Sequence, residues 1–139
     1  MTFQLVEPIL LIGLGGVGAR LAEKAKKSLN SDCLLISHDQ KDLTAENSIK
    51  ISTKSVVNPS THLIRGSTLE TSDEIKKNIA NYSTVILMSN LAGKAGTGIG
   101  PIVSRICKQE QKNLLSFVVM PFKFEKERIF QSGIALKRI

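Results

Sequence analysis

Two glycine-rich segments constrain the fold of this chain more than any other feature. Residues 13–18 (GLGGVG) follow an apolar run at 8–12 and precede apolar residues at positions 17, 21, 25 and 29. Residues 92–101 (AGKAGTGIGP) follow a second apolar run at 84–88. A short apolar run that ends at glycine is typical of a buried strand, and an apolar residue at every fourth position is typical of a helix. Each segment is therefore predicted to lead from a buried strand into a helix.

The rest of the sequence continues this alternation. Strands are expected at 33–36 and 114–120, weak strands around 49–51 and 63–64, a loop at 92–100, and helices from about 72, over 102–107 and over 125–138. Strands that are apolar throughout and alternate with helices imply a parallel sheet covered on both faces. We expect one α/β domain over residues 1–139, a Rossmann-like three-layer sandwich with a mostly parallel sheet.

Composition excludes several functions. The net charge is +7, but the lysines are spread over separate predicted elements, and the chain has no Trp and one Tyr. The chain therefore has few aromatic side chains that could stack on bases, and no nucleic-acid partner is expected. No apolar run reaches the roughly 18–20 residues that cross a bilayer, and the N-terminus lacks the pattern of a signal peptide. We expect no membrane insertion, a cytoplasmic location, and buried thiols at Cys33 and Cys107.

The first glycine segment has the chemistry of a phosphate site. Glycines let backbone N–H groups approach a phosphate closely, and the N-terminus of the following helix adds partial positive charge. Asp39 follows the second strand, about where a dinucleotide-binding fold places its ribose-binding acid. These two features alone suit an NAD domain or the adenylating enzymes related to ubiquitin activation. An aspartate in this position is also a common helix cap.

The second glycine segment changes this interpretation, because an NAD domain needs only one such turn. Its glycines free the backbone from side-chain obstruction, Thr97 can cap a helix or hydrogen-bond a phosphate, and Lys94 adds a cation. The spacing is not that of a Walker P-loop. Two such turns at neighbouring strand ends are predicted to bracket one polyphosphate.

At this point the sequence resembles FtsZ and, more distantly, tubulin and the bacterial tubulin-like proteins. Residues 12–18 resemble the first glycine loop of the family, and residues 92–98 (AGKAGTG) resemble its GGGTG signature. Residues 121–125 (PFKFE) match the family's Pro-Phe-x-Phe-Glu, which nothing in an NAD domain requires. Residues 37–40 (SHDQ) fall where FtsZ has a loop beginning Asn-Thr-Asp, and Asp39 keeps the acid. The resemblance covers essentially the whole chain and the N-terminal half of the family.

The resemblance implies GTP or GDP held over the strand ends with Mg²⁺. The first loop would approach the α- and β-phosphates, the second would wrap the β- and γ-phosphates, Asp39 would lie near the phosphates and the metal, and Glu125 would meet the ribose. The candidate nucleotide-binding residues are Gly13, Gly15, Gly16, Val17, Gly18, Arg20, Asp39, Gly93, Lys94, Ala95, Gly96, Thr97, Gly98, Glu125 and Arg128.

Departures from the family pattern bear on catalysis. Lys94 and Ala95 replace a Gly and a Thr of the signature, and the loop that senses the γ-phosphate is missing. The sequence also lacks the family's central helix, which grips guanine, and the acidic loop that activates water at a neighbouring subunit. We therefore assign no catalytic residue, expect no C-terminal activation domain, and expect slow or absent hydrolysis with poor base selectivity.

Three functions remain open on the sequence. The first is a reduced FtsZ-like nucleotide-binding module in cytoskeletal or division-type assembly, which associates with itself or docks onto a full-length relative. The second is a nucleotide-free interaction scaffold, favoured by Lys94 and the lost loops. The third is an NAD- or ATP-dependent Rossmann-type enzyme, for which the two histidines, His38 and His62, are thin catalytic candidates.

Overall fold

The fold is an open, five-stranded parallel sheet with helices on both faces. The computed structural model describes residues 6–45, 47–53, 59–90 and 93–119. The strands are β1 (Ile9–Leu14), β2 (Asp32–Ser37), β3 (Ser48–Lys50), β4 (Thr84–Asn90) and β5 (Asn113–Val119), and the helices are α1 (Gly15–Leu29), η1 (a short 3₁₀ helix, Gln40–Asp42), α2 (Thr61–Glu70), α3 (Ser72–Ile79) and α4 (Lys94–Gln109). Their order in the sheet is β3-β2-β1-β4-β5, and each neighbouring pair is parallel. The α/β sandwich expected from the sequence is confirmed.

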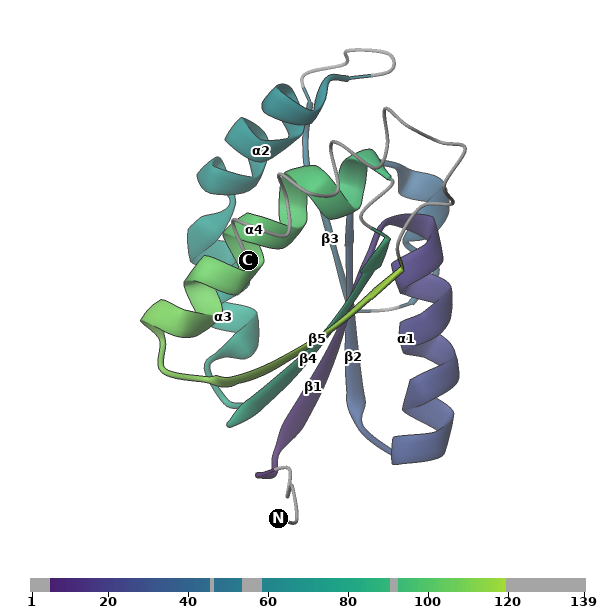
Figure 1. Ribbon diagram of the computed structural model, residues 1–139, viewed down its shortest axis with the longest axis vertical. Helices are drawn as coiled ribbons and strands as arrows, with labels where there is room; N and C mark the ends of the chain where they lie inside the picture. Colours follow the sequence, from purple (N-terminus) through teal and green to yellow (C-terminus); the bar gives the residue numbers. More distant parts are fainter. Residues whose placement is uncertain (1–5, 46, 54–58, 91–92, 120–139) are drawn as a thin grey trace.

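The chain changes direction across the sheet between β1 and β4. From β1 it passes through α1 to β2 on one side, and it returns through α2 and α3 to β4 on the other side of β1. Figure 1 shows α1 on one face of the sheet and α2, α3 and α4 on the other. In open α/β sheets, this reversal opens a crevice at the carboxyl ends of the two strands, where ligands are commonly bound.

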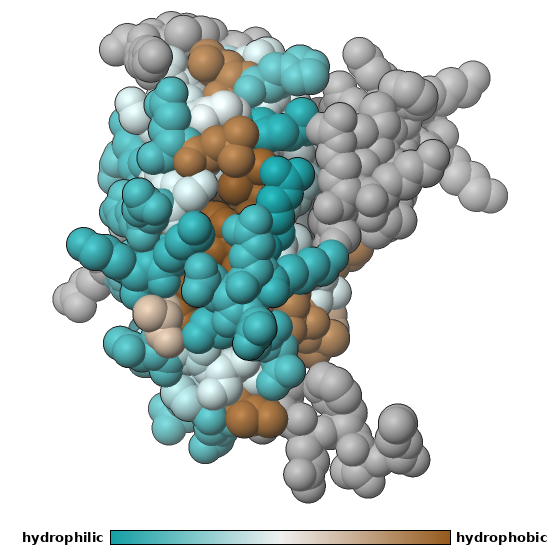
Figure 2. Space-filling model, turned by 90° about the vertical axis from the view of Figure 1, so that its left-hand side faces the viewer, coloured by the Kyte–Doolittle hydropathy of each residue, from teal (hydrophilic) through white to brown (hydrophobic). Residues whose placement is uncertain are grey.

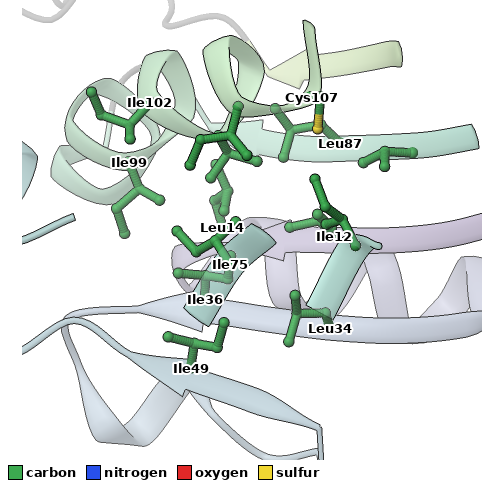
Figure 3. Packing of buried hydrophobic residues seen from close by; sticks show 14 of the residues in the cluster. Ile12, Leu14, Leu34, Ile36, Ile49, Ile75, Leu87, Ile99, Ile102 and Cys107 are labelled. Atoms are coloured by element: carbon green, nitrogen blue, oxygen red, sulfur yellow. The ribbon is translucent and has the colours of Figure 1, made fainter. Parts of the chain in front are cut away.

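The sheet is apolar on both sides because each side packs against helices. The larger core lies against α2, α3 and α4, and Figure 3 shows Ile12, Leu34 and Leu87 of three neighbouring strands within it. The smaller core lies against α1 and includes Leu11 and Ile86. Successive strand residues alternate between the two cores, as the period of two requires. This double burial is why the strands read as unbroken apolar runs.

The outer surface contrasts with this core. Figure 2 views the side where α2 and α3 lie, and the surface there is mainly hydrophilic, with hydrophobic residues in a narrow band. Over the described ranges, no helix has both the length and the apolar character needed to cross a bilayer.

Two local expectations are wrong. The weak strand expected around 63–64 lies inside α2, whose first turn is capped by Ser60, because the Ser60 hydroxyl accepts the Leu63 N–H at 3.2 Å. The loop expected over 92–100 is largely helix, because α4 begins at Lys94. Helix packing overrides the low helix propensity of glycine here. The expected helix at 125–138 and the segment 121–125 lie outside the described residues.

Candidate functional site

The two glycine segments lie side by side at one edge of the sheet. β1 and β4 are hydrogen-bonded neighbours, with Gly13 opposite Met88, so both strands end at the same edge. The turns that follow are in contact: a Cβ added at Gly15 would lie 2.8 Å from the Cβ of Ala95. Gly15 also has a φ of +70°, a backbone conformation that favours glycine. The two turns therefore lie together at one edge, where the sequence predicts that they bracket a polyphosphate.

A pocket of about 230 Å³ opens between these turns. Its volume is below the roughly 300–1,000 Å³ of typical small-molecule sites, so it suits a chain of phosphates better than a whole nucleotide. The pocket is lined by residues from both turns and from the end of β2, namely Leu14, Gly15, Gly16, Val17, Arg20, His38, Asp42, Asn90, Gly93, Lys94, Ala95 and Gly96.

The two helices that open onto the pocket have no capping side chain at their N-cap residues. Neither Leu14 at the start of α1 nor Gly93 at the start of α4 makes a side-chain capping hydrogen bond, and neither helix carries an acid in its first turn. In contrast, Ser60 caps α2, and α3 has Asp73 and Glu74 in its first turn. An uncapped helix start presents unpaired N–H groups and partial positive charge. Two such starts converge here, which is the arrangement that binds anions.

Several predicted glycines bring the elements together instead of lining the pocket. A Cβ at Gly18 would collide with the carbonyl oxygen of Met88, and one at Gly13 would lie 2.5 Å from the carbonyl oxygen of Gly18. A Cβ at Gly98 would lie 2.8 Å from Cγ2 of Ile64. These glycines allow α1 to approach the sheet and α4 to approach α2. They position the pocket, whereas Gly15, Gly16, Gly93 and Gly96 form its wall.

The side chains of two further predicted residues are engaged elsewhere. The Thr97 hydroxyl is buried and donates within α4, 3.0 Å from the carbonyl oxygen of Gly93. Asp39 precedes η1 and caps it, since its Oδ1 accepts the Lys41 N–H at 3.1 Å. Neither residue is among those that line the pocket. For Asp39, the helix-cap role weighed from the sequence is the one that the structure describes.

Lys94 lies at the pocket with its ammonium group tied to the chain. Its Nζ donates to the carbonyl oxygen of Pro59 at 3.0 Å, just before the residue that caps α2. Lys94 thus joins the start of α4 to the start of α2. Its positive charge adds to that of the two helix starts, as Arg20 does from the next turn of α1.

Four residues that line the pocket are outside the predicted nucleotide-binding set: Leu14, His38, Asp42 and Asn90. His38 and Asp42 come from the segment after β2, where the sequence suggested Asp39 as the ligand-binding acid and His38 only as a thin catalytic candidate. Nδ1 of His38 is buried and has no hydrogen-bond partner among the described residues. Asn90 ends β4, and its place at the carboxyl end of a strand at the reversal point is the signal that could have found it.

A larger hollow, about 940 Å³, lies elsewhere, along α1 and the start of β2, with Lys24, Asn30 and Cys33 in its wall. It shares Arg20 with the smaller pocket, but no residue of the two glycine turns lines it, so the smaller pocket is the better candidate. Within the described ranges, no group of three or more His, Cys, Asp or Glu side chains could hold a metal unaided. The predicted contacts of Glu125 and Arg128 lie outside the described residues.

Comparisons with known proteins point to one family. A family model described as "Tubulin/FtsZ family, GTPase domain" matches residues 60–139. The cell division protein FtsZ of Mycoplasmopsis pulmonis is 36% identical over 64 residues, which is 44% of this chain and 16% of that protein. The solved structure of an empty FtsZ dimer from M. jannaschii has a TM-score of 0.83 at 26% identity, over 94% of this chain and 41% of that one.

The same fold recurs at lower identity. The phage tubulin PhuZ, solved with GDP, superposes with a TM-score of 0.79 at 17% identity, over 94% of this chain and 42% of that one. The chain thus spans less than half the length of each of these proteins.

Proposed function

This chain belongs to the tubulin/FtsZ family, matching its GTPase domain over more than half of its length, and on that premise we propose that it binds a purine nucleoside triphosphate, GTP foremost, through the phosphates. The phosphates would lie between the starts of α1 and α4. Gly15, Gly16, Gly93 and Gly96 would offer backbone N–H groups to them, while Lys94 and Arg20 would balance their charge. Cytoplasmic action is part of the same proposal.

One observation carries this proposal: two uncapped helix starts face a single phosphate-sized pocket. An unsatisfied N–H group that is shielded from water costs free energy comparable to a lost hydrogen bond. Ser60 meets this demand at α2, and α3 carries the acids Asp73 and Glu74 in its first turn, although its N-cap residue, Thr71, makes no side-chain capping hydrogen bond either. A triphosphate would offer acceptors to the N–H groups at the starts of α1 and α4 at once.

The finer parts of the proposal follow from the same pocket. Its volume of about 230 Å³ leaves little room for a base, so selectivity between guanine and adenine is expected to be weak. Mg²⁺ would accompany the ligand, since it binds through substrate phosphates with one or two carboxylates. Asp42 is the carboxylate that lines the pocket in the described part of the chain. The given sequence lacks the acidic loop with which the family activates water, so we expect the 139-residue polypeptide alone to hydrolyse GTP slowly or not at all.

Assembly is proposed at the family level. The chain would associate with itself or dock its nucleotide-bearing edge onto a full-length relative. Sedimentation of the chain with and without GTP, alone and mixed with a full-length FtsZ, tests this. Nucleotide-dependent pelleting or a change in the relative's polymer mass supports it, and unchanged sedimentation in both settings counts against it.

Isothermal titration with GTP, GDP, ATP and NAD in the presence of Mg²⁺ tests nucleotide binding. Purine triphosphate binding supports the proposal, and a preference for NAD would replace it with a dinucleotide-dependent enzyme. A phosphate-release assay with GTP then tests turnover. Multiple turnovers by the isolated chain would contradict the expected lack of hydrolysis.

A second function is favoured by Lys94. Its ammonium group already donates to Pro59 at the pocket edge, so the chain has its own way of stabilising this region without a ligand. This arrangement suits a nucleotide-free scaffold that retains the fold as an interaction surface. Titrations that show no binding of any of the four nucleotides would favour this second function.

A further inference from the structure

Two aspartates follow β2, and they have different surroundings. Asp39 is exposed, and its carboxylate caps the start of η1 by accepting the Lys41 N–H. Asp42 ends η1 and is half-buried, and its Oδ2 accepts the hydroxyl proton of Ser37 at 2.8 Å. Ser37 itself is fully buried at the end of β2. The Ser37 hydroxyl therefore fixes the Asp42 carboxylate from the core side, while nothing comparable fixes Asp39 toward the pocket.

The fixed carboxylate faces the first turn of α1. A Cβ added at Gly16 would lie 2.9 Å from Oδ1 of Asp42 and 4.0 Å from Nη2 of Arg20. Asp42, Gly16 and Arg20 line the phosphate-sized pocket and also a neighbouring hollow of about 260 Å³. The carboxylate thus stands between the place proposed for phosphate and a second space large enough for a hydrated ion.

A carboxylate at this position conflicts with a bare triphosphate. Two negative groups a few ångströms apart repel each other strongly where water is partly excluded. A divalent cation between them reverses the sign of the interaction. Mg²⁺ prefers oxygen ligands and usually combines one or two carboxylates with substrate phosphates and waters.

We infer that Asp42, and not Asp39, is the carboxylate through which this chain holds the divalent cation of a bound triphosphate. The inference rests on the proposed nucleotide binding and assigns the metal contact to a different residue from the one that the sequence suggested. It gives Asp42 two effects: it weakens the binding of metal-free triphosphate, and it strengthens the binding of the magnesium complex.

The test measures the affinity for GTP by isothermal titration, with Mg²⁺ and with EDTA, for the wild type and three variants. The wild-type chain is expected to bind GTP at least tenfold more tightly with Mg²⁺. Asp42→Asn keeps an oxygen that accepts the Ser37 hydroxyl, so the loop is retained while the charge is lost. We expect its magnesium effect to fall below threefold, because binding in EDTA becomes tighter and binding in Mg²⁺ becomes weaker.

Two matched variants complete the test. Asp39→Asn removes the neighbouring acid and is expected to keep the wild-type magnesium effect, whereas Asp42→Glu restores the charge and is expected to recover at least part of it. A magnesium effect that survives in Asp42→Asn, or that is lost in Asp39→Asn, would overturn the inference while leaving nucleotide binding intact. If the wild type binds GTP in neither condition, the proposed function itself fails and the inference falls with it.

Discussion

Gly16 is a residue at which an added side chain would partly close the pocket. A side chain there would meet the Asp42 carboxylate rather than backbone. We expect Gly16→Val to weaken GTP binding at least tenfold, about 1.4 kcal/mol, because its methyl groups fill a pocket of only about 230 Å³. Isothermal titration measures the effect, and circular dichroism checks that the helices are retained.

Gly66 provides the matched control. It lies inside α2, and a Cβ there would meet no heavy atom within 4 Å. Gly66→Ala should leave the GTP affinity unchanged and raise the free energy of unfolding by about 0.5–1 kcal/mol, since alanine loses less backbone entropy in a helix. Gly96 is a poor choice for this test, because a Cβ there would collide with the carbonyl oxygen of Asn90 and disturb the backbone. Wild-type affinity in a folded Gly16→Val variant would contradict our placement of the phosphates.

The site was predictable from sequence as far as its backbone is concerned. Glycine after an apolar strand identifies a close approach of main chain, and the structure brings both such turns together. Side-chain directions after β2 were not predictable. Asp39 and Asp42 are three residues apart, and the 3₁₀ turn between them turns one toward a cap and the other toward the pocket. The pattern of residue types does not indicate which of the two side chains the 3₁₀ turn directs toward the pocket.

At the scale of elements, the contact between α2 and α4 depends on a glycine facing a branched side chain. A Cβ at Gly98 would lie 2.8 Å from Cγ2 of the fully buried Ile64. We expect Gly98→Ala to lower the free energy of unfolding by about 1–3 kcal/mol through overpacking, and Ile64→Ala by about 2–5 kcal/mol through the cavity it leaves.

For the double variant Gly98→Ala/Ile64→Ala, the free energy of unfolding should fall by less than the sum of the two single decreases, because the added methyl group enters the space vacated by Ile64. A double-mutant cycle from urea unfolding measures this coupling, expected at about 0.5–3 kcal/mol. Additive losses would show that the two helices do not meet through this pair.

Burial of α4 against the sheet also makes stability depend on pH. Burial raises the pKa of the Cys107 thiol to about 11, against a smaller opposing effect of the Lys112 ammonium. The unfolded thiol loses its proton at lower pH than the folded one. Between about pH 9 and pH 11 deprotonation therefore stabilises the unfolded state relative to the folded state, and the free energy of unfolding falls as the pH rises through this window. A shift of this size corresponds to roughly 2–3 kcal/mol.

Cys107→Ala should flatten that decline. Urea unfolding at pH 8.5 and pH 10.5 gives the loss for each protein, and the difference between them isolates the thiol from the lysines, which both proteins share. An equal loss in the two proteins would show that the thiol is not desolvated in the folded chain.

The residues at which the helices begin were the least predictable feature of the secondary structure. The pair at 63–64 is apolar and short, which suits a strand or a buried helix turn equally, and only the Ser60 cap and the packing of Ile64 decide for helix. In α4 the glycines read as loop, but the lack of a side chain at Gly96 and Gly98 is what lets this helix approach Asn90 and Ile64 closely. Long-range packing thus overrode a local propensity.

For the molecule as a whole, the reversal of chain direction between β1 and β4 unites the two glycine turns. α1 lies on one face of the sheet and α4 on the other (Figure 1), so their starts approach the same edge from opposite sides. A ligand there touches both layers, so its binding should stabilise the entire described fold and not one helix alone. This is the physical basis for detecting binding through global unfolding.

Thermal unfolding with different anions then separates the functions. If phosphates carry the binding, GTP, ATP and inorganic tripolyphosphate with Mg²⁺ should all raise the Tm, and inorganic tripolyphosphate should retain most of the effect. At one hundred times Kd a ligand adds about 2.7 kcal/mol of stability, a shift of several degrees for a domain of this size. NAD, whose two phosphates are esterified on both sides, should shift the Tm little. In Gly16→Val these shifts should shrink together, and a shift with NAD alone would instead indicate a dinucleotide site.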